Sequence, residues 1–456
     1  MYSPNPPTAI AWPALLSPRA VTVRWILTQM AKTERQPPQV REAGQRAQLH
    51  SLLTHAQRHV PFYQDRLGAA GFRPDRPLTE DVWRRIPILT RQEVQQHAES
   101  LRANALPPDH GKVFERTTSG STGVPLRVLK TELVGLFWDA VTARDMLWQE
   151  RDRTRPWHSI RFVRDNSAAF PEGSKAPSWG RVAGVLGPTG PGLGLDILTD
   201  PGQQIEWLQR SPPSYLLTYP SNLKALLQAT ASQGRMFPDL QQVITISESL
   251  PADLRETCRE QWGVPICDMY SATELGYIAI QAPHGDHYMV PDEVVRVELL
   301  DDAGDPVNVG EVGRVVVTPL HNYAMPLVRY QIGDYAERGD RSPCGRTLPV
   351  INRILGRVRN MLSYPDGRKV WPLFSDYRFR DIAPVRQFRV IQREIDALEL
   401  QVAAERELSE PEREALAQVI RERVSYPFRI TVTEHAEIAR SAGGKFEDFR
   451  NEVAPA

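Results

Sequence analysis

Strand and helix patterns alternate between residues 215 and 270, and this alternation restricts the fold more than any other feature of the chain. Short apolar runs at 215–218, 243–246 and 265–270 are typical of buried strands, and the segments 221–232 and 251–262 between them have helical spacing. Strands that alternate with helices form βαβ units, in which the strands are parallel neighbours in one sheet. We therefore expect an α/β fold that binds ligands where these strands end.

The rest of the chain predicts two domains. Nearer the N-terminus, we expect a helix that Pro61 ends, helices at 91–101 and 131–150, and a strand at 126–129. After residue 285 short strands follow one another, and residues 294–300 and 313–318 predict an antiparallel hairpin. The C-terminal part predicts a separate α+β unit, with strands at 387–391, 398–402 and 428–433 and a helix at 411–424 that a capping box from Ser409 opens. We expect a large N-terminal domain of parallel and mixed sheets, residues 1–355, and a small C-terminal domain, residues 356–456.

Charge balance and cysteine content limit the kinds of partner. The 456 residues carry 55 Lys and Arg against 55 Asp and Glu, without the basic excess of nucleic-acid-binding proteins. Three cysteines without a CxxC pair argue against a disulfide framework and favour a reducing compartment. Prolines and arginines interrupt the apolar residues between 8 and 31, unlike a signal peptide or a membrane span. We expect a cytoplasmic protein that binds neither nucleic acid nor membrane.

The segment 118–123 reads Thr-Ser-Gly-Ser-Thr-Gly and is followed by Val124 and Pro125. Glycines let the backbone approach an anion, successive N–H groups form an anion-binding nest, and hydroxyl groups donate further hydrogen bonds. This composition predicts a loop that binds nucleotide phosphates, although a flexible turn would have the same residues. The segment lacks the Gly-Lys-Ser/Thr ending of other phosphate-binding loops.

Four later segments carry single residues suited to the same ligand. Glu274 follows the predicted strand at 265–270, where a carboxylate can hold Mg²⁺, or where a helix can begin. Asp334 follows Gly333 and could bind ribose hydroxyl groups or lie in a solvated turn. Gly356-Arg357 could be a linker, and Lys445 follows two glycines that would make it a mobile cation or an ordinary surface charge.

Taken in order along the chain, these segments resemble the motifs of the adenylate-forming superfamily, which includes acyl- and aryl-CoA ligases, adenylation domains and luciferases. The resemblance implies that Lys445, Thr273 and Glu274 are catalytic, and that Glu274 holds Mg²⁺. It implies a hinge at Arg359 and Asn360. The implied ATP-binding residues are Thr118, Ser119, Gly120, Ser121, Thr122, Gly123, Ser249, Tyr270, Ser271, Asp334 and Arg357.

Within this superfamily, three segments resemble the phenylacetate–CoA ligase branch and its relatives in capsule biosynthesis: residues 55–63, residues 319–330 and the Gly-Gly-Lys-Phe sequence that ends at residue 446. The chain also departs from the superfamily. Leu126 stands where many members have lysine, residues 247–249 read Ser-Glu-Ser in place of Gly-Gly-Glu, and Arg359-Asn360 replaces an acidic pair. Some relatives bind zinc, but here Ala282 replaces a cysteine and leaves His284, His287 and the distant Cys344, fewer than the four ligands of a structural zinc site.

The resemblance implies that the protein joins a carboxylic acid to the α-phosphate of ATP as acyl-AMP and releases pyrophosphate. The small C-terminal domain would then rotate, move Lys445 away and admit the thiol of CoA. A carrier-protein thiol or an amine, as in natural-product or polysaccharide biosynthesis, is the alternative acceptor, and a catalytically silent nucleotide-binding scaffold is a further alternative. The superfamily includes both monomers and homodimers.

The substrate acid is predicted to contact the helix at 131–150, the strand segment at 215–220 and the Ser-Glu-Ser segment at 247–249. Phe137, Trp138, Tyr215, Tyr219 and Ser247 would line this pocket, and aromatic side chains suit an aryl acid. Glu248 could bind an amine, which would favour an amino or aminoaryl acid. The same aromatic residues could equally belong to the hydrophobic core.

Overall fold

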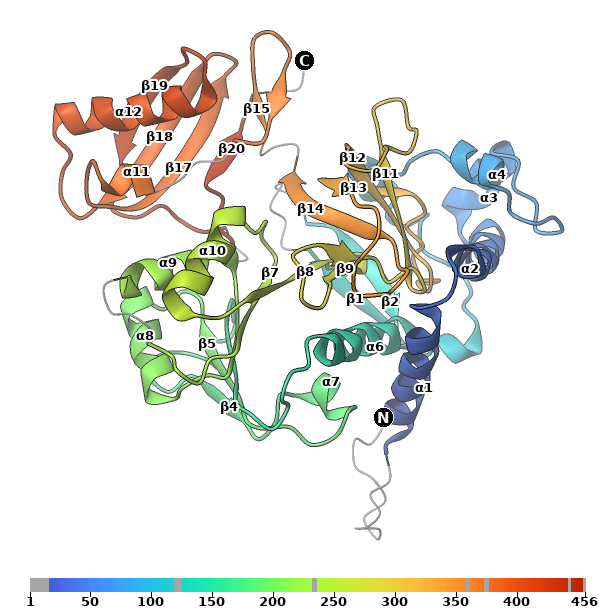
Figure 1. Cartoon of the computed structure of the whole chain (residues 1–456). Coiled ribbons are helices and arrows are strands. Elements are labelled where there is room, and N and C mark those ends of the chain that lie inside the picture. The colour runs from blue at the N-terminus through green and yellow to red at the C-terminus, as the bar shows by residue number, and fades with distance from the viewer. Residues whose placement is uncertain are drawn as a thin grey trace. The chain divides into compact units, whose positions relative to one another are not determined.

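The computed structural model describes residues 16–118, 125–231, 236–357, 361–372, 377–441 and 444–453. The chain divides into two compact units, and the smaller unit is C-terminal (Figure 1). The larger unit comprises residues 1–332 and 336–354, and the smaller comprises residues 333–335 and 355–456. Asp334 is grouped with the smaller unit, and its carboxylate lies near the guanidinium of Arg357. The arrangement confirms the predicted α/β fold with a separate C-terminal domain.

A mixed sheet of twelve strands in the order β11-β12-β13-β14-β10-β9-β8-β7-β6-β3-β5-β4 runs through the molecule. Strands β5, β3, β6, β7 and β8 are parallel neighbours, which confirms the parallel pairing predicted for residues 215–270. Their order along the chain is β3 (Trp157–Arg161), β5 (Gly192–Asp196), β6 (Tyr215–Thr218), β7 (Gln242–Ile246) and β8 (Ile266–Ala272), with β4 (Ser174–Ala176) antiparallel at the edge.

The other half of this sheet follows β8. Strand β9 (Gly276–Gln281) pairs antiparallel with β8 and with β10 (Tyr288–Met289), and β10 pairs antiparallel with β14 (Val350–Arg357). Strands β11 (Val295–Leu300) and β12 (Val312–Pro319) form the antiparallel hairpin predicted from the sequence, and β13 (Tyr330–Arg338) lies beside β12. A separate two-stranded sheet consists of β1 (Val113–Thr117) and β2 (Arg127–Thr131).

Helices of the larger unit begin at recognisable caps. Ser17 caps α1 (Pro18–Thr33), and Thr90 and Glu93 form a capping box at α5 (Arg91–Gln96). Helix α2 (Pro38–His59) ends just before Pro61, as predicted, because proline cannot continue the hydrogen-bond ladder. The remaining helices of more than one turn are α3 (Gln64–Ala69), α4 (Glu80–Arg85), α6 (Glu132–Trp148), α8 (Pro201–Arg210), α9 (Pro220–Thr230) and α10 (Ala252–Trp262).

Two of the three hydrophobic cores in the described part of the larger unit position the sheets. One packs α8, α9 and α10 against the parallel strands. The other joins α2 to the antiparallel strands, and it contains Leu126, which precedes β2, Val128 of β2, and Tyr270 and Leu275 of the β8–β9 hairpin. This second core fixes the small β1–β2 sheet next to the carboxyl end of β8.

The smaller unit is an α+β structure around a four-stranded sheet of order β19-β18-β17-β20. Strands β17 (Val385–Glu394), β18 (Ala397–Ala404) and β19 (Arg429–Glu434) match the three predicted strands. Helix α12 (Glu410–Val424) packs on them, and the predicted capping box between Ser409 and Glu412 is present. Two-residue strands β15 (Leu362–Ser363) and β16 (Lys369–Val370), helix α11 (Tyr377–Arg380) and β20 (Phe449–Asn451) complete the unit. Across the described ranges, no helix is long and apolar enough to span a membrane.

Candidate active site

The two ends of the predicted phosphate-binding loop are tied together by hydrogen bonds. The backbone N–H of Thr118 donates to the carbonyl oxygen of Leu126 at 2.9 Å, and the N–H of Leu126 donates to the Thr118 hydroxyl oxygen at 2.9 Å. The loop thus connects β1 and β2, although Ser119, Gly120, Ser121, Thr122 and Gly123 lie outside the described residues. Leu126, which replaces the superfamily's lysine, is buried in the core with 2% of its surface exposed.

Thr273 and Glu274 lie in the turn between β8 and β9. The turn closes through a hydrogen bond from the Leu275 N–H to the Ala272 carbonyl, and Gly276 follows with a φ of 93°. The alternative prediction of a helix start here is wrong, because the chain reverses into β9 instead. Thr273 is exposed, whereas Glu274 is 6% exposed. Its carboxylate fits a Mg²⁺ ion that also binds substrate phosphates, since such ions need only one or two protein carboxylates.

Two predicted pocket residues come from α6, which packs against both β2 and β9 (Figure 1). Trp138 is 37% exposed, and its ring lies 4.3 Å from that of Tyr277 on β9. Phe137 stacks on His321 with ring centroids 3.7 Å apart. Burial lowers the pKa of His321 to about 4, so this ring is neutral near pH 7. Trp138 therefore presents a partly open aromatic surface beside the β8–β9 turn.

The two predicted pocket tyrosines lie at opposite ends of β6. Tyr219 follows the carboxyl end of β6 and begins α9, whereas Tyr215 is the first residue of the strand. The Tyr215 hydroxyl donates to Gln241 and accepts from the Asp152 N–H, both at 2.7 Å. Tyr215 is buried, and its hydroxyl is hydrogen-bonded at the amino end of β6, which makes it a weaker candidate for the pocket than Tyr219.

The Ser-Glu-Ser segment after β7 has an unusual backbone. Ser247 has a φ of 72°, a left-handed conformation that favours glycine, which is the superfamily's usual residue in this segment. The carboxylate of Glu248 accepts hydrogen bonds from the Ser221 N–H at 2.9 Å and from the Ser221 hydroxyl at 3.1 Å. Glu248 thus binds the N-terminus of α9, where a negative charge is favourable, in contrast to the predicted contact with a substrate amine. Ser249 is exposed.

The remaining predicted residues belong to the smaller unit. Asp334 is 8% exposed on β13, which contradicts the alternative of a solvated turn, and its carboxylate lies 3.5 Å from the guanidinium of Arg357. Lys445 is half-buried in a tight turn, where its carbonyl oxygen accepts from the Ser441 N–H at 2.8 Å. The hinge residues Arg359 and Asn360 lie outside the described residues.

The branch-specific segments at 55–63 and 319–330 pack against each other. The His55 imidazole bonds to the Tyr323 carbonyl at 3.1 Å, and the Tyr63 hydroxyl donates to the Pro326 carbonyl at 3.0 Å. Burial lowers the pKa of His55 to about 4, so the contact uses a neutral ring. These segments therefore stabilise the larger unit. Their resemblance to the phenylacetate–CoA ligase branch reflects shared packing contacts rather than contacts with a substrate.

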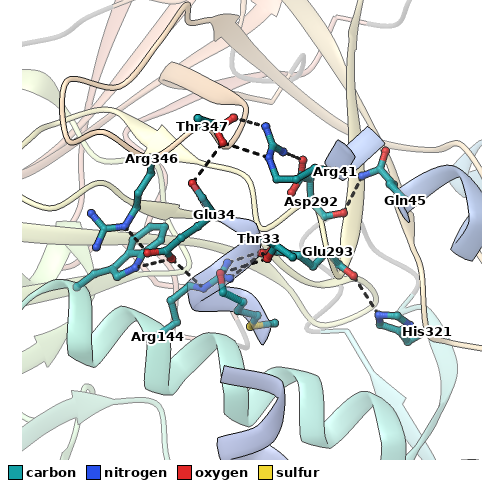
Figure 2. A network of polar contacts seen from close by, with 12 residues as sticks. Thr33, Glu34, Arg41, Gln45, Arg144, Asp292, Glu293, His321, Arg346 and Thr347 are labelled. Carbon is teal, nitrogen blue, oxygen red and sulfur yellow. Dashed lines mark hydrogen bonds and ion pairs between the residues drawn. The ribbon is translucent and has the colours of Figure 1, made fainter. Parts of the chain in front are cut away.

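A buried ionic network joins α6 to the end of α1 and to Glu293 and Arg346 (Figure 2). Arg144 of α6 donates to both carboxylate oxygens of Glu293, at 2.7 and 3.2 Å, and the Glu293 carbonyl accepts from His321. Glu34, at the end of α1, accepts from Trp148 of α6 at 3.1 Å and from Arg346 at 3.0 Å. The network fixes α6, and with it Phe137 and Trp138, against α1 and the strands.

Lys130 is a charged residue of this region that the sequence analysis did not single out. It is half-buried on β2, and burial lowers its pKa to about 8, while the negative charge of Glu274 acts in the opposite direction. The sequence carries a signal, because strand alternation places Lys130 on the same face as the apolar residues Leu126 and Val128.

Two of the three residues left from the zinc site of some relatives lie near each other. His287 bonds to the Ser342 hydroxyl at 2.8 Å, and that hydroxyl lies 3.0 Å from the sulfur of Cys344. In the part of the chain that the structure describes, no group of three or more His, Cys, Asp or Glu residues is arranged to hold a metal ion.

The hydroxyl-rich segment between β1 and β2, the buried carboxylate of Glu274 after a parallel strand and the separate unit that carries Lys445 are the features from which an adenylate-forming enzyme is predicted. The family model for AMP-binding enzymes matches residues 45–321, which is more than half of the chain. The chain belongs to this family, and the resemblance to adenylate-forming enzymes is confirmed.

Among named proteins, the chain is similar to phenylacetate-coenzyme A ligase of Thermus thermophilus, with 25% identity over 90% of this chain and 96% of the relative. It is 24% identical to the Escherichia coli phenylacetate-coenzyme A ligase, over 79% of this chain and 82% of that one. A crystal structure of 2-hydroxyisobutyryl-CoA ligase in the postadenylation state has a similar fold, with a TM-score of 0.71, 19% identity and 92% of each chain covered.

Proposed function

We propose that this enzyme activates an aryl or aminoaryl carboxylic acid with ATP and transfers the acyl group to the thiol of CoA. The observation that carries the proposal is the buried carboxylate of Glu274 in the turn after β8, beside the partly exposed ring of Trp138. Similarity to phenylacetate-coenzyme A ligases along nearly the whole chain supports the same reaction class.

In the first half-reaction, an oxygen of the acid attacks the α-phosphorus of ATP, the bond to the bridging oxygen breaks, and pyrophosphate leaves with that electron pair. Both reactants are anions, so alignment and neutralisation of charge limit the rate. When bound, Mg²⁺ supplies positive charge to the phosphate oxygens. Glu274 would hold that ion, Thr273 would contact the α-phosphate, and Lys445 would neutralise charge on the reacting oxygens.

In the second half-reaction, the CoA sulfur attacks the acyl carbonyl, the bond to AMP breaks, and the thiol proton passes to solvent. The proposal requires the smaller unit to move between the two steps. In the first step it would bring Lys445 to the reacting oxygens. In the second step it would move Lys445 away, so that the thiol can reach the acyl-AMP.

The proposal of an aryl acid depends mainly on Trp138. Its exposed ring offers a flat apolar surface at the site, and aromatic substrates stack on such rings. An aminoaryl acid is less favoured than the sequence suggested, because the carboxylate of Glu248 already binds Ser221. Tyr219 and Ser247 stay candidates for the pocket.

Pyrophosphate exchange with a panel of carboxylic acids tests the proposal. We expect ATP–pyrophosphate exchange with aryl acids and, after addition of CoA, the corresponding thioester. Turnover of aliphatic fatty acids alone would reject the aryl substrate. If the acyl-AMP reacts with a carrier protein or an amine but not with CoA, that group is the acceptor and CoA is rejected. If the protein binds ATP but shows no exchange with any acid, it is a nucleotide-binding scaffold.

A further inference from the structure

We infer that Arg389 is a positioning residue, which holds the turn that carries Lys445 in the conformation required for adenylation. The inference rests on the proposed function, because that function makes Lys445 the residue that neutralises charge on the reacting oxygens. It follows from the hydrogen bonds of Arg389, from its burial and from the way in which the turn is closed.

Arg389 bonds to the backbone on both sides of this turn. Its Nε donates to the carbonyl oxygen of Glu447 at 2.9 Å, and a terminal nitrogen donates to the carbonyl oxygen of Ala439 at 3.0 Å. The two carbonyls bracket the segment 440–446, of which residues 442 and 443 lie outside the described ranges. A guanidinium is a planar group whose donors have a fixed geometry, so the two bonds set the separation of the two ends of the segment.

Strand β17 directs Arg389 toward the turn. Alternation along the strand places Phe388 and Val390 in the hydrophobic core of the smaller unit. Gln387 and Arg389 lie on the opposite face, and the Gln387 side chain accepts a hydrogen bond from the Ile438 N–H at 2.9 Å. This face of β17 therefore binds the backbone that leads into the turn as well as the backbone that leaves it.

Short-range bonds around Lys445 shape the turn itself. The Ser441 N–H donates to the Lys445 carbonyl at 2.8 Å, and the Lys445 N–H donates to the Ser441 hydroxyl at 3.2 Å. The Arg440 side chain donates to the Gly444 carbonyl at 3.2 Å. After the turn, β20 pairs in parallel with β17 (Figure 1). These bonds fix the shape of the turn and its C-terminal side, and Arg389 connects its N-terminal side to the same strand.

The residue next to Lys445 contacts the same guanidinium. The guanidinium carbon of Arg389 lies 4.9 Å from the centroid of the Phe446 ring, and that of Arg440 lies 5.8 Å from it. A cation over the face of an aromatic ring is attracted to it. Because Phe446 follows Lys445 directly, a displacement of Arg389 would be passed to the backbone of Lys445.

The burial of Arg389 also indicates a role in shaping the backbone. The residue is 8% exposed, and its hydrogen-bond acceptors within the described ranges are carbonyl oxygens, not carboxylates. Burial lowers the pKa of Arg389, because it disfavours the charged form. An apolar side chain of similar length would avoid this cost, but it could not donate to two carbonyls at once.

The experiment measures both half-reactions in Arg389→Met. We expect the kcat for pyrophosphate exchange to fall by on the order of 10²-fold, because a displacement of about 1 Å can cause such a loss. The KM values for ATP and the acid should stay within about twofold of wild type, since substrate binding is not affected. Thioester formation from added acyl-AMP should be unchanged, because Lys445 has moved away before that step.

The double variant Arg389→Met/Lys445→Ala separates positioning from a general effect on the smaller unit. If Arg389 acts through Lys445, the double variant should exchange pyrophosphate as fast as Lys445→Ala alone, because residues that act as a unit are not additive. Arg393→Met is the matched control. It lies on the same strand but bonds to Glu399 and Glu452, so it should behave as wild type.

Three results would overturn the inference: wild-type exchange in Arg389→Met, equal losses in the two half-reactions, or a further loss when Arg389→Met is added to Lys445→Ala. If thermal unfolding shows that Arg389→Met does not fold, Arg389→Lys takes its place. Its single nitrogen cannot occupy both donor positions, so a smaller loss confined to pyrophosphate exchange is expected, and wild-type exchange would overturn the inference. Normal exchange in Lys445→Ala, or no exchange in the wild type with any acid, contradicts the proposed function itself, so the two failures can be distinguished.

Discussion

At the scale of single residues, the site depends on charges that the fold holds in place before substrates bind. Glu274 is buried in the β8–β9 turn, although Thr273 beside it is exposed, and its negative charge acts on Lys130 of β2. Preorganised charges of this kind contribute to catalysis because they need no reorganisation when the transition state forms.

Lys445 provides a direct test of this principle. Lys445→Ala should lower the rate of acyl-AMP formation by on the order of 10²–10³-fold, because a positive charge on the reacting oxygens is lost. The fold and ATP binding should be nearly unchanged, since Lys445 lies in a turn that its backbone closes. Pyrophosphate exchange and ATP binding measure the two effects. Lys369→Ala, an exposed lysine of the same unit, is the control, and equal rates in Lys445→Ala and wild type would contradict the assignment.

The backbone conformation of Ser247 is expected to lower the free energy of unfolding. A left-handed backbone costs a residue with a side chain about 1–2 kcal/mol, and glycine avoids this cost. With a φ of 72° at this position, Ser247→Gly should raise the free energy of unfolding by about 1 kcal/mol, measured by denaturant titration. Ser249→Gly is the control, because it adds only freedom to the unfolded chain and should lower stability. A lower stability for Ser247→Gly would show that the serine side chain makes a compensating contact.

At the scale of elements, α6 is the part on which the site is assembled. Phe137 and Arg144 lie two turns apart on one side of this helix, where they contact His321 and Glu293, and Trp138 contacts Tyr277 of β9. The β8–β9 hairpin depends on α6 in turn, since Tyr277 of β9 contacts the Trp138 ring and bonds to Thr142 at 3.0 Å.

The ionic network behind α6 should be important for folding. Arg144→Met removes the ion pair of the largely buried Glu293 carboxylate, which keeps only the hydrogen bond from the Thr33 hydroxyl, and breaking a buried pair typically costs about 3–5 kcal/mol. Arg378→Met breaks an exposed pair with Glu422 and should cost less than about 1 kcal/mol. Thermal and denaturant unfolding of both variants measure the difference. Similar stabilities for the two would mean that water solvates Glu293 when Arg144 is absent.

At the scale of the whole molecule, the enzyme is proposed to perform two reactions with one site. Glu274 and Trp138 belong to the larger unit, whereas Asp334, Arg357 and Lys445 belong to the smaller unit. A rotation of the smaller unit would therefore change which charges the substrate meets, and only a few residues need to absorb the change in backbone torsion.

The hinge can be tested by restricting its backbone. Asn360→Pro fixes φ at about −65° and should separate the half-reactions, because a hinge held in one conformation supports one of them and impairs the other. Pyrophosphate exchange measures the first step, and thioester formation from added acyl-AMP measures the second. Asn360→Ala is the control. Survival of both steps in Asn360→Pro would show that the rotation takes place elsewhere or is not needed.

Local signals in the sequence predicted much of the fold. The capping box at Ser409, the end of α2 before Pro61 and the parallel strands between 215 and 270 were predicted because each depends on residues close together in the chain. Strand β9 was missed, since the turn at Glu274 has the same local residues as a helix start. Tyr215 was assigned to the pocket because it is an aromatic residue of β6. The sequence does not show that its hydroxyl donates to Gln241 at the amino end of that strand.

The order of the motifs, and with it the family, can be obtained from the sequence alone, because phosphate and ribose binding require particular residue types in short segments. Contacts between distant segments cannot be obtained in this way. The bond between His55 and Tyr323 and the bond from Ser221 to Glu248 join residues that only the folded chain brings together. Burial and charge at such contacts are properties of the packed structure, and they distinguish a residue that supports the site from one that is free to bind a substrate.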